Sequence, residues 1–270
     1  MKTRKVILIT GASRGIGPSL AEELSSRGHR VYGTGRTRLK EELPFHYMVL
    51  DMTNGRSVKK AVGDIIKAEG SVDVLVNNAG VSHCGSVEET PETIARDMFE
   101  TNYFGPIFLI RGVLPHMRER RSGTIVNVTS AAGKIGRPFE GHYSASKFAM
   151  EGLSETLRLE VTPFGIRVIV VEPGDVGTAI WEHTAKTEAG NSPYEGMLRR
   201  FLAVKAREMG DSADSPGNVA RQIADAIESK GARFRFPVAK MAGLIMAAQK
   251  ILPERLFLKI IANNYNLYGK

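Results

Sequence analysis

Short apolar runs alternate with longer, helix-like stretches along this chain of 270 residues. Runs rich in valine, isoleucine and leucine predict buried strands; they cover residues 5–10, 30–34, 46–50, 72–76, 124–128 and 165–171. Between them, apolar residues recur at helical spacing, for example over residues 57–68 and 91–118. Because strands and helices alternate, we expect one α/β domain with a three-layer architecture, in which parallel strands are joined by right-handed crossovers and covered by helices on both faces.

A glycine-rich turn follows the first predicted strand and opens the first predicted helix. Glycines let a backbone approach a pyrophosphate, and the free N–H groups and dipole of a helix N-terminus favour its charge. A tight turn alone would also explain the glycines, but the flanking strand and helix favour a phosphate cradle. We assign the whole turn to cofactor binding, through Gly11, Ser13, Arg14, Gly15, Ile16 and Gly17.

The second strand is followed by Gly35 and Arg36. Folds that bind NAD usually place an acid here to hold the adenosine ribose, whereas the 2′-phosphate of NADP requires a cation and no acid. Arg14 reaches the same place from the glycine turn. The pair predicts NADP(H) as the cofactor; two solvated arginines are the alternative.

Further polar and small residues follow the other strands, at the edge where a parallel sheet binds its ligands. Asp51 is placed to accept a hydrogen bond from the adenine amine, and Met52 follows it. The turn Asn77-Asn78-Ala79-Gly80 would brace the sheet and flank the ribose, although a purely structural turn also explains Asn77. The turn after residue 171 would close over the nicotinamide with Pro173, Gly174, Val176 and Thr178.

The segment from Thr124 to Lys147 carries the candidate chemistry. Lys147 follows Tyr143 by four residues, so a helix places the phenol and the ammonium on one face. A phenol has a pKa of roughly 10 and needs a nearby cation to exchange protons at neutral pH, and we expect Lys147 to be that cation. Ser130, at a strand end, would hydrogen-bond a substrate oxygen. Taken alone, Tyr-x-x-x-Lys is also an ordinary surface pair.

Asn102 lies in the middle of the long helical stretch over residues 91–118. Asparagine has low helix propensity, so a buried one needs a reason, such as a bound water or a local bend.

With these motifs together, the chain resembles the short-chain dehydrogenase/reductase family, in its single-domain form of about 250 residues. The match runs from Lys5 to about Thr178 through TGASRGIG, NNAG, Asn102, Ser130, YSASK and PG-DVGT, and residues 136–153 are similar to the 17β-hydroxysteroid and retinol dehydrogenase branch. The resemblance implies a seven-stranded Rossmann sheet and a catalytic set of Asn102, Ser130, Tyr143 and Lys147. It also implies that Tyr143 and Lys147 contact the cofactor, that no metal takes part, and that the chain forms homodimers or homotetramers through the two long helices around Asn102 and Tyr143.

Composition limits the cellular compartment and the kinds of partner that we expect. The chain has one cysteine, which excludes an internal disulfide, and the apolar run before Gly11 is too short for a signal peptide, so we expect a cytoplasmic protein. No His or Cys has metal-ligand spacing to His83 and Cys84, so we expect no metal site. We expect a small-molecule substrate and no nucleic acid partner.

Two segments lie outside the motifs. Residues 175–214 are predicted to form a substrate lid, with apolar material in Trp181, Tyr194, Met197 and Phe201. Residues 231–270 form a basic amphipathic extension with seven Lys or Arg against Glu254 alone. We interpret its apolar face as core packing, a partner interface or a peripheral membrane contact, and prefer a partner subunit.

These features predict an NADP(H)-dependent oxidoreductase that interconverts a carbonyl and an alcohol, on a steroid, retinoid or other lipid-like substrate. Two alternatives are an NADP(H)-binding sensor on the same fold and a protein whose main role is contact with membranes or other proteins.

Overall fold

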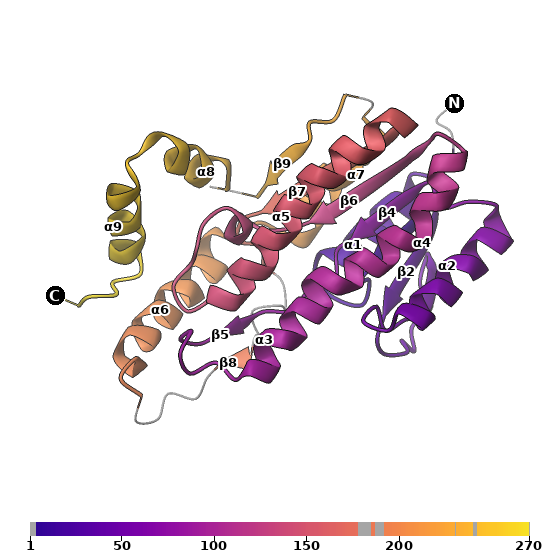
Figure 1. The fold of residues 1–270 in the computed structure, drawn as a ribbon. Helices are drawn as coiled ribbons and strands as arrows, with labels where there is room; N and C mark the ends of the chain where they lie inside the picture. Colours follow the sequence, from indigo (N-terminus) through magenta and orange to yellow (C-terminus); the bar gives the residue numbers. More distant parts are fainter. Residues whose placement is uncertain (1–3, 178–184, 187–191, 230, 240–241, 270) are drawn as a thin grey trace.

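A computed structural model describes residues 4–177, 185–186, 192–229, 231–239 and 242–269. Within these residues, seven parallel strands form the main sheet in the order β3-β2-β1-β4-β6-β7-β9 (Figure 1). The strands are β1 Val6–Thr10, β2 Arg30–Gly35, β3 His46–Val49, β4 Val74–Asn77, β6 Gly123–Val128, β7 Ile166–Pro173 and β9 Arg235–Val238. The predicted three-layer Rossmann fold with a seven-stranded sheet is confirmed.

Helices cover both faces of this sheet, because side chains of successive strand residues point to opposite faces. Ile7 and Ile9 of β1 pack toward α1 and α7, whereas Leu8 packs toward α2, α4 and α5. The helices are α1 Ile16–Ser26, α2 Gly55–Glu69, α4 Gly105–Glu119, α5 Gly141–Val161 and α7 Pro216–Glu228. Each face of the sheet therefore has its own buried hydrophobic core. Ligands can reach the sheet at the carboxyl ends of its strands.

The order of strands reverses between β1 and β4. From β1 the chain proceeds outward to β2 and β3, and from β4 it proceeds in the other direction to β6 and β7. Ligands of open α/β sheets bind at such a switch point, outside the carboxyl ends of the strands.

The long helix predicted over residues 91–118 is interrupted in its middle. α3 Glu92–Phe99 passes into a single π turn, Glu100–Phe104, and then into α4. Asn102 lies in that π turn, so the expected local bend is present at the expected residue.

The C-terminal segment differs from the expectation of a separate extension over residues 231–270. Its first part, β9, is the edge strand of the main sheet and pairs with β7. Only the two following helices, α8 Ala242–Ile251 and α9 Glu254–Asn264, lie outside the three layers (Figure 1). Within the described residues, no helix has the length and hydropathy that crossing a bilayer requires.

The segment predicted as a lid contains α6 Glu195–Arg207 and a second π turn, Glu208–Ser212. Its strand β8 Ala185–Lys186 pairs with β5 His83–Cys84 in a small separate sheet. Short 3₁₀ turns precede and follow α5, at Ala131–Gly133 and Thr162–Phe164.

Candidate active site

The glycine turn is held in a conformation that larger residues would not adopt. Gly11 and Gly15 have φ angles of 70° and 71°, in the left-handed region. A Cβ added to Gly17 would lie 2.0 Å from the Gly11 carbonyl oxygen. Gly17 thus lets the start of α1 pack directly on Gly11, and this packing fixes the shape of the turn.

The turn after β4 braces the glycine turn from the neighbouring strand. The Asn78 side chain donates a hydrogen bond from Nδ2 to the Thr10 carbonyl at 2.9 Å, and the Asn78 and Ala79 backbone amides donate to Thr10 Oγ1 at 3.0 Å. A Cβ on Gly11 would lie 2.8 Å from Ala79 Cα. The two turns therefore meet at the switch point between β1 and β4.

Asn77 has a different position from its neighbour Asn78. Its side chain is buried and donates to Asn127 Oδ1 at 2.8 Å, and Asn127 in turn donates to Ser154 Oγ. These contacts match the structural alternative for Asn77, because they join β4, β6 and α5 within the core.

The ends of β2 and β3 carry the residues predicted to hold the adenosine end of the cofactor. Arg14 and Arg36 are both exposed. Ser13 and Tyr47 converge on Gly35, since a Cβ there would lie 3.1 Å from Ser13 Oγ and 2.2 Å from the Tyr47 hydroxyl oxygen. Ser13 is thus adjacent to the place where a 2′-phosphate would lie.

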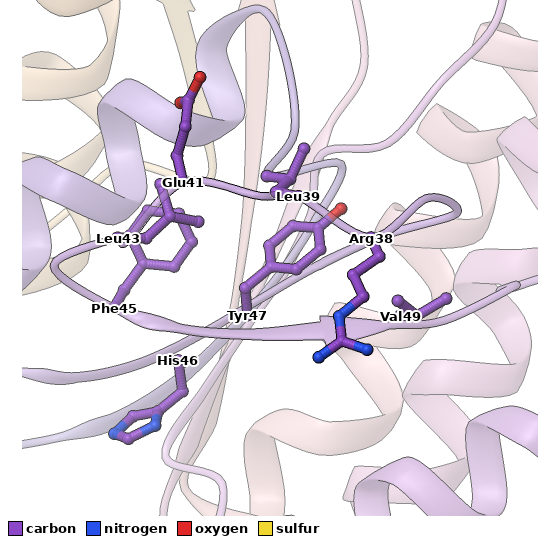
Figure 2. A pocket seen from close by; sticks show the side chains of 8 residues that line it. All are labelled: Arg38, Leu39, Glu41, Leu43, Phe45, His46, Tyr47 and Val49. Carbon is purple, nitrogen blue, oxygen red and sulfur yellow. The ribbon is translucent and has the colours of Figure 1, made fainter.

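A cavity of about 500 Å³ opens beside β3, and Tyr47 and Arg38 are among the side chains that line it (Figure 2). The Tyr47 hydroxyl donates to the Thr37 carbonyl at 2.9 Å. The sequence did not indicate either side chain, because Tyr47 reads as an ordinary strand residue and Arg38 as a solvated one.

The side chains of Asp51 and Met52 lie in different environments, one exposed and one buried. Asp51 is exposed, and its Oδ1 accepts hydrogen bonds from the Thr53 amide and hydroxyl. The Met52 side chain is buried beneath Gly105 of α4, where an added Cβ would lie 2.7 Å from Met52 Cε. Of the two side chains, Asp51 is the one that presents a hydrogen-bonding group at the surface.

Ser130, Tyr143 and Lys147 come together as their spacing predicts. Ser130 lies two residues after β6, beside the Tyr143 side chain, and its hydroxyl accepts from the Ala132 amide at 3.1 Å. Lys147 lies one turn beyond Tyr143 on α5, with its Nζ 5.8 Å from the centre of the phenol ring. Lys147 Nζ donates to the Val128 carbonyl at 3.1 Å, which anchors it to the end of β6.

Asn102 is held near Lys147 by hydrogen bonds to Val81 and Ser146. Its Oδ1 accepts from the Val81 amide at 2.9 Å, and its Nδ2 donates to the Val81 carbonyl at 2.9 Å and to Ser146 Oγ at 3.0 Å. A Cβ on Gly80 would lie 3.3 Å from Asn102 Oδ1 and 3.4 Å from Lys147 Nζ. The π turn thus brings the asparagine and the lysine next to the same glycine.

Burial raises the pKa of the Tyr143 phenol, because the interior penalises the phenolate. The guanidinium of Arg137 and the hydrogen bond from Ser130 act in the opposite direction, and the carboxylate of Glu140 adds to the rise. Burial also lowers the pKa of Lys147 to about 8, against the opposing charge of Glu151. Arg137 is thus a further cation that acts on the phenol, and the expectation that Lys147 lowers the pKa of Tyr143 stays a prediction.

Arg137 belongs to a buried ion cluster in the loop that leads into α5. Its guanidinium contacts Glu140 and lies 3.4 Å from Asp175 Oδ1. Lys205 of α6 donates to the same Asp175 oxygen at 2.6 Å. Sequence reasoning missed this cluster. The one available signal was a cation six residues before Tyr143, since the contacts to Asp175 and Lys205 depend on the tertiary fold.

The turn after β7 closes this side of the site. Pro173 ends the strand, and the Gly174 amide donates to the Val238 carbonyl of β9 at 3.0 Å. Val176 is buried and bridges to Asp214, so the turn is fixed at both ends. Thr178 and Trp181 lie outside the described residues.

The rest of the predicted lid is partly tied to the body. The Tyr194 hydroxyl donates to Glu88 at 2.6 Å. Phe201 is buried between Phe139 and Tyr265, with ring centres 5.6 and 4.9 Å away. Phe201 is therefore a core residue of the lid, whereas Met197 is half-buried on the same helix.

Among the described residues, no group of three or more His, Cys, Asp or Glu has the geometry to hold a metal ion. His83 and Cys84 are both buried in β5.

Known proteins similar to this chain include two bacterial reductases. The 3-ketodihydrosphingosine reductase of Bacteroides thetaiotaomicron is 38% identical over 255 residues, which cover 93% of this chain and 94% of the relative. The NADPH-dependent 3-dehydrocapnine reductase of Ornithobacterium rhinotracheale is 31% identical over 270 residues, with 94% of each chain covered.

A solved structure has the same fold over nearly the whole chain. The short-chain dehydrogenase/reductase of Burkholderia phymatum in complex with NAD superposes with a TM-score of 0.80 and 26% identity, covering 96% of each chain. The family model of the short chain dehydrogenases matches residues 5–189. With the glycine turn, the bracing asparagine and the serine, tyrosine and lysine in one place, this chain is an oxidoreductase of the short-chain dehydrogenase/reductase family.

Proposed function

We propose that this protein is an NADP(H)-dependent oxidoreductase that interconverts a carbonyl and an alcohol on a lipid-like substrate. The observation that carries the proposal is that Ser130 lies beside the half-buried Tyr143 phenol, one helical turn from Lys147. A hydroxyl donor beside a proton-exchanging phenol is the pair that reduction of a carbonyl oxygen requires.

Each side chain has a distinct task in the direction of reduction. Ser130 donates a hydrogen bond to the substrate oxygen as negative charge develops there, and Tyr143 gives that oxygen a proton. Lys147 binds the nicotinamide ribose and returns a proton from solvent toward Tyr143, with Asn102 beside it at Gly80. The guanidinium of Arg137 lowers the pKa of Tyr143 and so offsets part of the rise that burial causes.

The residues present fit a dinucleotide cofactor. The nicotinamide supplies or accepts the hydride, and the chain binds and orients it. The backbone of the turn at Gly11, Gly15 and Gly17 would receive the pyrophosphate, because Gly11 and Gly15 have positive φ angles that side chains disfavour. Pro173, Gly174, Val176 and Thr178 would border the nicotinamide, and Asn78, Ala79 and Gly80 the ribose. Ile16, at the start of α1, would present its amide to a phosphate.

The preference for NADP(H) over NAD(H) rests on charge. Arg14 and Arg36 are exposed beside Ser13, and no acid stands at the end of β2. One similar reductase is named as NADPH-dependent, whereas one similar structure holds NAD, so charge at this position is the feature that separates the two cofactors.

The lipid-like substrate is supported by the names of two relatives, whose substrates are 3-ketodihydrosphingosine and 3-dehydrocapnine. The lid of this chain offers apolar side chains on α6, including Met197 and Leu202. A carbonyl on a long aliphatic chain would place its reacting end at Tyr143 and its chain against this helix.

Replacing Tyr143 by phenylalanine tests the proposed function. We expect the variant to lose turnover of every active substrate in a screen of ketones, aldehydes and secondary alcohols, by about 10²–10⁴-fold, because the proton transfer is lost. NADPH binding, followed by fluorescence, is expected to stay unchanged. Retention of more than about a tenth of wild-type turnover at saturating cofactor would remove the role of Tyr143.

A further inference from the structure

The two C-terminal helices carry an exposed surface of apolar and cationic side chains, which we call the tail surface. Its large apolar side chains are 45–80% exposed: Leu244, Ile251, Leu256, Leu258, Ile260 and Tyr268. Its cations are Lys250, Arg255 and Lys259, and the single acid of this part of the described chain is Glu254. Exposed leucines and isoleucines scattered singly are normal, but here they gather on two consecutive helices.

The exposed residues follow helical spacing, so they form faces of the helices. On α8, Leu244, Ala247 and Ile251 are three and four residues apart and are exposed, whereas Ala242 and Met246 are buried. On α9, Leu256 and Ile260 are exposed one turn apart, beside Lys259. The tail surface is thus an outer face, separate from the side of each helix that packs inward.

The inner sides of the same helices are firmly attached to the body. Tyr265 is buried against Phe201 of α6. Arg200 donates to the Asn266 and Leu267 carbonyls at 2.7 and 2.8 Å, and Gln249 donates to the Lys134 carbonyl at 2.7 Å. The outer face is therefore presented in a defined orientation, and packing within the chain does not explain its apolar side chains.

An apolar face of this kind could contact a second copy of this chain or a lipid membrane, and its charges distinguish the two. In a twofold dimer built on this surface, each copy would present the same patch, so Lys250, Arg255 and Lys259 would meet cations of the partner with one acid per chain to offset them. An anionic lipid surface accepts both features, since apolar side chains enter between the headgroups and cations contact the phosphates.

We propose that the tail surface docks the protein on an anionic lipid membrane. The inner side of the same helices is connected to the candidate active site, because Tyr265 packs on Phe201 and Phe201 packs on Phe139, four residues before Tyr143. Docking would hold the lid region next to the bilayer. The second half of this inference, that a lipid-like substrate enters from that bilayer, rests on the proposed function.

Vesicle binding of the full chain tests the docking. The test compares sedimentation with vesicles of phosphatidylcholine alone and with vesicles of phosphatidylcholine and phosphatidylglycerol in equal amounts. One variant replaces Lys250, Arg255 and Lys259 with glutamine, and a second replaces Leu244 and Ile251 with glutamine. A matched control replaces Lys59, Lys60 and Lys67 of α2 with glutamine, which removes the same charge from the opposite side of the molecule (Figure 1).

We expect binding to the anionic vesicles only. The tail cation variant should lose up to about 100-fold in affinity at low salt, because each cation contributes roughly fivefold and three such factors multiply to about 100. The apolar variant should also lose binding, and the α2 control should stay within about twofold of the wild type. Equal binding by all variants, no binding, or loss of an oligomer in the tail variants without any change on vesicles would each overturn the proposal.

The assay uses no substrate, so its result is independent of the proposed function. A water-soluble ketone in buffer without vesicles provides the second readout. If the tail variants lose vesicle binding but keep this turnover, the tail surface acts in docking and not in catalysis. If turnover is absent in all variants while vesicle binding is intact, the result counts against the proposed function alone.

Discussion

Arg137 and Glu140 act on the same phenol with opposite sign. The guanidinium lowers the pKa of Tyr143 and the carboxylate raises it, while the two side chains also pair with each other. A single loop in front of α5 therefore sets the protonation behaviour of the candidate acid and base.

Substitution at these two positions is expected to move the pH profile in opposite directions. Oxidation of an alcohol needs the ionised phenol, so its rate rises with pH through the pKa of Tyr143. Arg137→Gln should shift the midpoint of this rise to higher pH, and Glu140→Gln should shift it to lower pH. Profiles of kcat for a common alcohol measure both, with NADPH binding as the check on folding. Shifts of the same sign would contradict the assignment.

Cofactor choice is also decided by single side chains. We expect Arg36→Gln to weaken NADPH binding by about tenfold or more, because a charge-assisted contact with the 2′-phosphate contributes about 1.5–3 kcal/mol. NADH binding should not change. Fluorescence titration at moderate salt measures both constants, and Arg96→Gln, an exposed arginine on α3, is the matched control. Equal losses for the two cofactors would show that Arg36 does not contact the phosphate.

At the scale of elements, the join between β7 and β9 contains a buried carboxyl. Glu172 of β7 is 2% exposed, and burial with the nearby charge of Glu151 raises its pKa to about 7. Lys134 and Arg235 oppose that rise, at 3.8 and 3.5 Å from Glu172 Oε1. The carboxyl is therefore easier to protonate in the folded chain than in the unfolded one.

This arrangement predicts a stability that falls as pH rises. Because the folded pKa of Glu172 lies above its unfolded value, its favourable contribution is complete below about pH 4.5 and is lost as pH rises through about 7. We expect Glu172→Gln to remove this part of the slope between pH 5 and pH 8 in urea unfolding. Glu155→Gln, whose carboxyl has a lowered pKa at the surface, is the control. An unchanged slope in the Glu172 variant would contradict the prediction.

Much of the sheet could be predicted from the sequence because its central strands are buried on both faces. Residues 6–10 and 124–128 consist mostly of β-branched and apolar residues for that reason, and the turns that follow them hold the site. The four-residue spacing of Tyr143 and Lys147 was likewise sufficient to place them on one helical face.

β9 could not be found in the same way. Arg235, Phe236 and Pro237 form no apolar run, since the strand lies at the edge and is half-exposed. What holds it is its pairing with β7 and the contacts of Arg235 with Glu151 and Glu155, all distant in sequence. Arg137 escaped prediction for the same reason, because its partner Asp175 arrives from the far end of β7.

At the scale of the whole molecule, α5 leaves apolar side chains in solvent. Phe148 and Leu159 are 45% and 77% exposed, and Phe104 at the start of α4 is 41% exposed. The family resemblance implies pairing through these long helices, and the exposed aromatic residues suit such an interface.

We therefore expect the chain to be an oligomer that Phe148→Ser with Leu159→Ser weakens by at least about tenfold in dissociation constant, because buried aromatic side chains dominate such interfaces. Sedimentation velocity over a range of concentrations measures it. Val49→Ser, at an exposed position on β3, is the control and should leave the assembly unchanged. A wild-type chain that stays monomeric throughout the range would contradict this interface.

The two ends of the predicted lid segment, near Gly177 and Asp214, lie next to each other. The Gly177 amide donates to the Asp214 carbonyl at 2.9 Å and the Asp214 amide to the Asp175 carbonyl at 3.1 Å, so the two ends of the segment are fastened together beside the carboxyl end of β7. The entropy of closing such a loop grows slowly with its length. Segments of other lengths can therefore join these two ends. A chimaera that carries a relative's segment between Gly177 and Asp214 is expected to change its substrates and keep its chemistry if it retains Phe201 and Lys205, whose contacts with Phe139 and Asp175 lie next to Tyr143.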